Sequence, residues 1–281
     1  MKNILKIAGV ALLLTTTSAF AQHAGHGGAP KGPSAPEWTS LPMLVSGGGF
    51  SRAGTKYQAY NMHAMESSSY ASYDGQGIDA LKAATQSLVV DDNGAVTMKI
   101  GEAGGYYLVR VTGHGPAGEI ATATTLKYFS QPGPAPRDLL NTPRGGFEIA
   151  PAVLPREHGH YREGEQGWPF IVRMDGKPMA GISVVLETSN GTKADYTTDA
   201  GGIVKVTIPE DFKDIPKDEW AHGRPPYSKF VIAARDGGLL ATYNDSYAMG
   251  AFAAKNLWAG VGFAVLGMAL AVPLVRRRKK A

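Results

Sequence analysis

Residues 181–208 read GISVVLETSNGTKADYTTDAGGIVKVTI and contain the clearest structural signal in the chain. Apolar and polar residues alternate along Ile182–Glu187 and again along Val204–Ile208. Ser189-Asn190-Gly191 and Asp199-Ala200-Gly201-Gly202 interrupt the alternation with residues that favour tight turns. Alternation with a period of two, bounded by Gly, Asn and Asp, is typical of antiparallel strands joined in hairpins.

Further alternating or apolar runs flank this stretch on both sides. They are Phe147–Leu154, Trp168–Met174, Phe230–Ala234 and Leu239–Tyr247. About seven strands in roughly 100 residues suit a β-sandwich. We therefore expect residues 147–250 to form one sandwich domain.

A first β-rich domain is expected over residues 38–130. Val96–Ile100 and Tyr107–Val111 alternate there, although Ile78–Leu88 has a composition equally suited to a short helix. The Pro- and Gly-rich stretch 131–146 is expected to be a linker between the two domains.

The positive charge is concentrated at the two ends of the chain. The formal net charge is +4, but Lys2, Lys6 and the basic run Arg276–Lys280 contribute seven cations, without which it falls to −3. The excess belongs to terminal segments, so we expect no nucleic-acid partner. The chain has no cysteine, which excludes disulfides and thiolate metal sites.

Residues 1–21 have the pattern of a secretory signal peptide. Lys2 and Lys6 precede the apolar run Ile7–Leu14, and Ala19-Phe20-Ala21 offers small residues for cleavage. An uncleaved anchor is the alternative. The Gly-, Pro- and His-containing segment 22–37 is then expected to be a flexible leader.

Leu257–Val275 is a run of residues without charge, and a basic tail at 276–281 follows it. A helix over this run would cover roughly 28 Å, about the thickness of the bilayer hydrocarbon. The basic tail marks the cytoplasmic side. We expect an exported, periplasmic protein held by one C-terminal transmembrane helix, or alternatively a sorting tail that is removed.

The sequence also resembles a known family. The D-G-K-P-x-A-G element at Asp175–Gly181 and the T-D-x-x-G element at Thr198–Gly202 are similar to those of an exported uncharacterised-domain family, described as the periplasmic component of nickel/cobalt uptake systems. Both elements also occur in transthyretin-like and carboxypeptidase-regulatory-like sandwiches. The resemblance implies an all-β fold of two Ig-like or transthyretin-like β-sandwich domains, a bound transition-metal ion or its chelate, and membrane transporter subunits as partners.

His158-Gly159-His160 is the first candidate metal site. In an extended chain the two histidines point to the same side, roughly 7 Å apart. Imidazole binds Ni, Co, Cu or Zn, and nothing in the chain selects among these metals. The alternative interpretation is a solvated loop that happens to contain histidine.

Two further candidates contain histidine. His23 and His26 lie in the leader, where an imidazole near the new N-terminus can chelate Cu(II) or Ni(II). His63 lies in Asn61–Glu66, which combines imidazole, thioether and carboxylate. In this segment the two methionines can equally be core residues.

No catalytic motif is present: the chain has no G-x-S-x-G, H-E-x-x-H or phosphate-binding loop. We therefore expect no enzyme. The sequence predicts an exported, membrane-anchored protein that binds a transition metal and assists metal uptake or handling. A non-enzymatic structural or adhesion module that binds proteins or glycans is the alternative, and an unrecognised hydrolase using Asp and His is a third.

Overall fold

The computed structural model describes residues 36–47, 55–73, 85–88, 90, 91, 94–98, 105–129, 136–155, 161–213 and 226–250. All of them belong to one compact unit that begins at Pro33. The expected signal peptide, most of the leader, and the segments at 257–275 and 276–281 lie outside the described residues. Within the described part of the chain, no helix has the length and apolar character needed to cross a bilayer.

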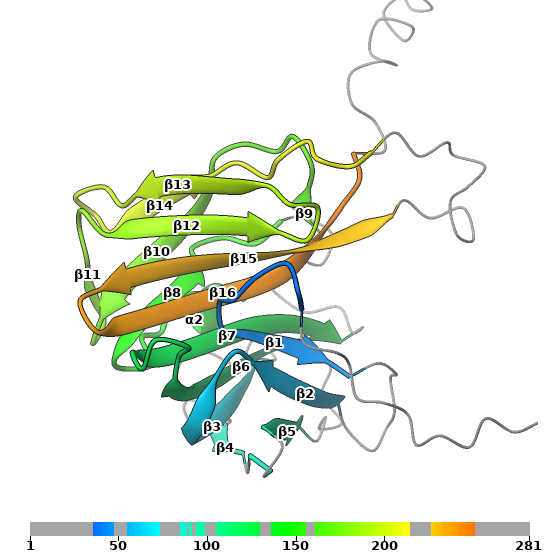
Figure 1. Ribbon diagram of the computed structural model, residues 1–281. Helices are drawn as coiled ribbons and strands as arrows, with labels where there is room; N and C mark the ends of the chain where they lie inside the picture. Colours follow the sequence, from blue (N-terminus) through cyan, green and yellow to red (C-terminus); the bar gives the residue numbers. More distant parts are fainter. Residues whose placement is uncertain are drawn as a thin grey trace, which may run out of the picture. The chain divides into compact units, whose positions relative to one another are not determined.

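The strands form three sheets, which confirms the all-β prediction (Figure 1). The large sheet has nine strands in the order β13-β12-β15-β16-β7-β6-β3-β4, and β9 pairs with β16. A second sheet has the order β1-β2-β5, and a third the order β11-β10-β14 with β8 paired to β10. The strands are β1 (Met43–Ser46), β2 (Thr55–Tyr60), β3 (His63–Tyr73), β4 (Thr85–Ser87), β5 (Ala95–Met98), β6 (Gly105–His114), β7 (Ile120–Phe129), β8 (Phe147–Pro151), β9 (Tyr161–Arg162), β10 (Trp168–Met174), β11 (Lys177–Pro178), β12 (Ser183–Thr188), β13 (Lys193–Thr197), β14 (Ile203–Val206), β15 (Tyr227–Asp236) and β16 (Leu239–Ala248).

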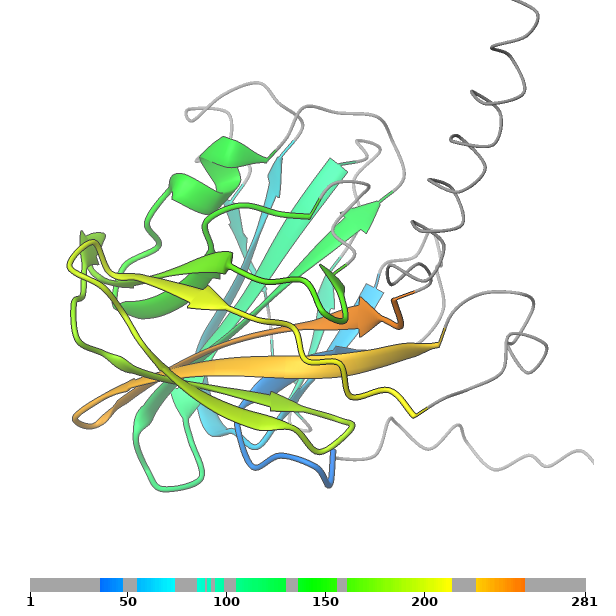
Figure 2. The same cartoon turned by 90° about the horizontal axis from the view of Figure 1, so that it is seen from above.

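The middle of the large sheet is covered on both faces (Figure 2). On β6, Tyr107 and Val109 pack with β1, β2 and β5 in one hydrophobic cluster. Tyr106 and Leu108 of the same strand pack with β8, β10 and β14 in another. Because successive side chains of a strand point to opposite faces, the two small sheets cover opposite sides of the large one.

The two predicted domains therefore share one sheet. β7 lies in the expected first domain and β16 in the expected second, and they pair in parallel from Ile120↔Leu239 to Thr125↔Asn244. The expected linker also contributes to the core, since it contains the helix α2 (Arg137–Asn141) with Leu139 and Leu140 buried. Thr85–Ser87, within the stretch that also suited a helix, is strand β4.

A buried ion cluster holds the helix α2 in place. Arg173 Nε lies 3.0 Å from Glu148 Oε1, and Arg173 also donates to the carbonyl oxygens of Asn141 and Leu140. Arg144 donates to the carbonyl of Leu139 and lies 3.6 Å from the other oxygen of Glu148. Cationic donors at the C-terminal carbonyls stabilise a helix. They attach α2 to strands β8 and β10.

Two turns are present with a clear physical basis, and the sequence predicted the one at Asp199–Gly202. Asp199 accepts hydrogen bonds from the backbone nitrogens of Gly201 and Ile203, at 2.8 and 2.9 Å. At the Asp175-Gly176 turn both residues have positive φ, 47° and 80°. Such backbone geometry favours Asp, Asn and Gly, which is why these residues mark the hairpins in the sequence.

Candidate functional site

The strongest candidate for a metal centre is a pair of histidines on neighbouring strands. His63 begins β3 and His114 ends β6, and the two stand directly opposite each other in the antiparallel register. Their ring centroids are 5.8 Å apart and their planes are inclined by 29°. Imidazole nitrogens bind Zn²⁺ at about 2.0–2.1 Å, so two rings that share an ion have centroids roughly 4.5–6.5 Å apart. The observed separation lies in this range.

The strand ends place both rings where an ion can approach. The side chain of His63 is exposed and that of His114 is half-buried. Nδ1 of His114 lies 3.4 Å from the carbonyl oxygen of Gly118, in the turn that joins β6 to β7. Backbone carbonyls commonly orient metal-binding histidines in this way. The carboxylate of that turn, Glu119, bonds instead to Arg235 at 2.8 Å and to the backbone nitrogen of Ala117 at 2.9 Å.

Of the histidines that the sequence suggested, the structure describes only His63. His158, His160, His23 and His26 lie outside the described residues. Within the described ranges no group of three or more His, Cys, Asp and Glu side chains could hold a metal ion. A metal at the pair would therefore need further ligands from water, from the ion's own chelator or from other parts of the chain.

The neighbours of His63 take the alternative role predicted for them. Met62 and Met65 both pack against the cluster between the large sheet and β1-β2-β5. Asn61 has a φ of 56° and donates to the carbonyls of Thr39 and Leu41, at 3.1 and 3.0 Å. The two thioethers are thus partly buried against the core, whereas the imidazole of His63 is exposed.

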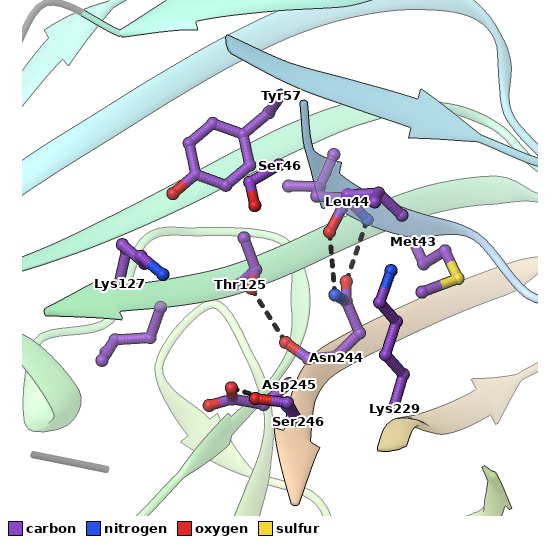
Figure 3. A pocket seen from close by; sticks show the side chains of 12 residues that line it. Met43, Leu44, Ser46, Tyr57, Thr125, Lys127, Lys229, Asn244, Asp245 and Ser246 are labelled. Carbon is purple, nitrogen blue, oxygen red and sulfur yellow. Dashed lines mark hydrogen bonds between the residues drawn. The ribbon is translucent and has the colours of Figure 1, made fainter. Parts of the chain in front are cut away.

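A second polar site is a pocket of about 120 Å³ between the large sheet and β1-β2 (Figure 3). Side chains of five strands line it. They are Met43, Leu44, Val45 and Ser46 of β1, Tyr57 of β2, Thr125, Leu126 and Lys127 of β7, Lys229 of β15, and Asn244, Asp245 and Ser246 of β16. No motif in the sequence marks these residues as a site.

The strand pairing explains why the pocket is there. β16 pairs with β7 up to Asn244 and with β9 from Tyr247 onward. Asp245 and Ser246 therefore stand between these two partner strands. The backbone N–H of Ser246 has a local acceptor here, since it donates to Asp245 Oδ1 at 2.7 Å.

Asp245 is the acidic side chain among the residues that line the pocket, and its pKa is strongly raised. Burial raises its pKa to about 7, against the opposing effects of the Ser246 N–H, the Tyr243 hydroxyl and the cation of Lys127. Tyr243 donates to Oδ2 at 2.9 Å. Burial, together with the nearby Asp245, also raises the pKa of Tyr57. At neutral pH the pocket thus combines a phenol and a carboxyl that is only partly ionised.

Comparisons with known proteins give distant likenesses. No protein-family model matches the chain, and no curated protein matches it. Among solved structures, a tetra-tandem repeat from the extending region of a large adhesion protein is 10% identical over 75% of this chain, with a TM-score of 0.25. A Ca²⁺-stabilised adhesin of an Antarctic bacterium is 15% identical over 70%, with a TM-score of 0.22.

A two-domain fibronectin type III segment of chicken tenascin is 10% identical over 74% of this chain and has a TM-score of 0.24. The chain covers 98% of the tenascin segment but only 49% of the adhesion-protein repeat and 44% of the Antarctic adhesin. With TM-scores this low, none of these likenesses bears on the function proposed below.

Proposed function

We propose that the chain acts by binding rather than by catalysis, and that it binds a transition-metal ion at His63 and His114. The observation that carries this proposal is the direct opposition of the two imidazoles on β3 and β6, with ring centroids 5.8 Å apart. Imidazole suits Cu, Ni, Co and Zn, and among divalent ions Cu²⁺ is expected to bind tightest. The ion would be cargo, held with open coordination positions.

The family resemblance supports a role in metal uptake or handling. In this role the protein is exported, the segment 257–275 anchors it at the periplasmic face of the cytoplasmic membrane, and transporter subunits are its partners. His158 and His160, with His23 and His26 of the leader, would be additional metal-binding groups. A single anchor forms no pore, so transport itself would require the partner.

The test is a calorimetric titration of the metal-free full-length chain with Ni, Co, Cu and Zn. We expect the double variant His63→Ala/His114→Ala to weaken the tightest binding at least tenfold. His222→Ala, which removes one imidazole elsewhere in the chain, is the matched control and should bind like the wild type. Loss only in His158→Ala/His160→Ala would disprove the cross-strand pair while leaving a metal-binding protein.

A second candidate is a non-enzymatic module that binds proteins or glycans. The outermost strand β13 favours this second function, because one of its faces is exposed to solvent. Ser183 of β12 and Lys193, Asp195 and Thr197 of β13 are exposed, while Val184 and Leu186 of β12 point into the core. Absence of metal binding, together with retention on a glycan array that is lost in Lys193→Ala/Asp195→Ala, would support this function instead.

A further inference from the structure

We propose that the pocket between β1 and β16 binds a small oxyanion, a carboxylate or phosphate group, recognised by Tyr57, Lys127 and Asp245. This site is separate from the histidine pair and does not depend on the proposed metal binding. Three observations support it: an unpartnered buried hydroxyl, the balance of charge, and the size of the pocket.

The first observation concerns the hydroxyl of Tyr57. The side chain is only 2% exposed and lines the pocket, and its buried oxygen has no hydrogen-bond partner. Buried polar groups in native proteins almost always have a partner, and each exception calls for an explanation. In Figure 3 this hydroxyl lies on the side of the ring toward Lys127. An oxygen of a bound anion would accept its hydrogen bond.

The second observation is that cations outnumber anions around the pocket. Lys127 and Lys229 line it, and Asp245 is the acidic side chain among its lining residues. The groups that face Asp245 are Tyr243 on its own strand, Lys127 of β7, Tyr57 of β2 and Tyr161 of β9, whose pKa is raised by burial and then by Asp245. Each of these groups is neutral or cationic at neutral pH.

The protonation state of Asp245 adds to this preference for an anion. With its pKa near 7, a large fraction of the carboxyl carries a proton at neutral pH. A protonated carboxyl donates a hydrogen bond, which an oxyanion can accept. A divalent cation would meet two ammonium groups, and the carboxyl oxygens already accept from Tyr243 and Ser246. The pocket chemistry therefore selects negative charge.

The third observation is size and rigidity. A volume of about 120 Å³ admits a group of a few heavy atoms. The wall on the β1 side is fixed, because the side-chain amide of Asn244 bonds to both backbone groups of Leu44, at 2.9 and 2.8 Å (Figure 3). A preformed wall lowers the entropy cost of binding. The ligand is thus a small molecule or a single anionic group on a larger one.

The experiment measures binding of acetate, inorganic phosphate and chloride to the full-length chain at pH 6 and constant ionic strength, by calorimetry and thermal shift. We expect acetate, phosphate or both to bind at millimolar concentrations or tighter, and chloride not to bind. Lys127→Gln should weaken binding at least tenfold and Tyr57→Phe several-fold. Lys205→Gln removes an exposed cation of β14 and is the matched control.

Tyr57→Phe also separates ligand binding from folding. The variant removes only a hydroxyl that has no partner, so without anion it should melt at the wild-type temperature or above it. The anion should then stabilise the variant less than it stabilises the wild type. Equal stabilisation by chloride, no binding by either oxyanion, or full binding in both pocket variants would overturn the proposal. Loss of metal binding in His63→Ala/His114→Ala has no bearing on it.

Discussion

The side chain of Asn244 substitutes for a missing strand partner of Leu44. Its amide oxygen accepts from Leu44 N at 2.9 Å, and its amide nitrogen donates to Leu44 O at 2.8 Å. Thr242, two residues earlier on β16, donates to the carbonyl of Pro42 at 2.8 Å. Side chains of one sheet thereby hold the edge strand of another, and they fix one wall of the oxyanion pocket.

Asn244→Ala should lower the free energy of unfolding by about 2–4 kcal/mol, because two buried backbone groups of Leu44 lose their partners. Urea denaturation followed by circular dichroism measures this effect. Thr197→Ala, on the exposed face of β13, is the control and should change stability by less than about 0.5 kcal/mol. Equal stability of Asn244→Ala and the wild type would show that β1 is held by other contacts.

Gly202→Ala should destabilise the protein by about 2–4 kcal/mol, which is in the range of severe backbone effects. Gly202 has a φ of +71°, and an added Cβ would lie 2.8 Å from both Val172 O and Met179 N. The matched control is Gly238→Ala, where an added Cβ meets nothing within 4 Å. We expect a clear fall in melting temperature for the first variant and little change for the second.

The sequence predicted local structure well, because strand and turn signals are local. The alternation along Ile182–Glu187 matches β12, and the Asp199–Gly202 turn is present with its side-chain hydrogen bonds. The inward-facing residues Val184 and Leu186 are fully buried. Period-two patterning is sufficient to tell which face of a strand enters the core.

Long-range pairing was not predictable in the same way. Alternation does not say which strand lies beside which, so the parallel pair β7–β16 and the opposition of His63 and His114 were missed. Nothing in the sequence around His114 indicates a site, and only the register of β3 against β6 reveals the pair. Likewise α2 depends on Arg144, Arg173 and Glu148, whose contacts outweigh the Pro and Gly content around it.

Glu148→Gln should lower the free energy of unfolding by about 3–5 kcal/mol, since removing one partner of a buried ion pair leaves the other uncompensated. Glu148 is 3% exposed and lies beside Arg173 and Arg144, and burial lowers the pKa of Arg144 to about 10. Lys56→Gln breaks the pair with Asp91, in which the two side chains are 56% and 43% exposed, so it should cost less than about 1 kcal/mol. Similar losses in the two variants would contradict the assignment of a buried cluster.

Ionisation of the buried Asp245 should lower the free energy of unfolding as the pH rises from about 4 to 7. Its pKa in the folded protein is raised from 3.8 to about 7. Between pH 3.8 and about pH 7 the folded state binds more protons than the unfolded state. Asp245 therefore contributes favourably to the free energy of unfolding at low pH, and this contribution is lost as the pH rises to about 7. Asp245→Asn keeps a neutral acceptor for Tyr243 and should remove this part of the profile.

The measurement is urea denaturation of the wild type and Asp245→Asn at pH 4.5 and pH 7.5, in buffers free of carboxylate and phosphate. Because other acids titrate equally in both proteins, the difference between the two profiles isolates Asp245. We expect the wild type to lose on the order of a few kcal/mol relative to the variant across this range. Asp195→Asn, an exposed acid on β13, should follow the wild type. Parallel profiles for wild type and Asp245→Asn would show that the carboxyl is ionised throughout, and the oxyanion pocket would then lack its hydrogen-bonding acid.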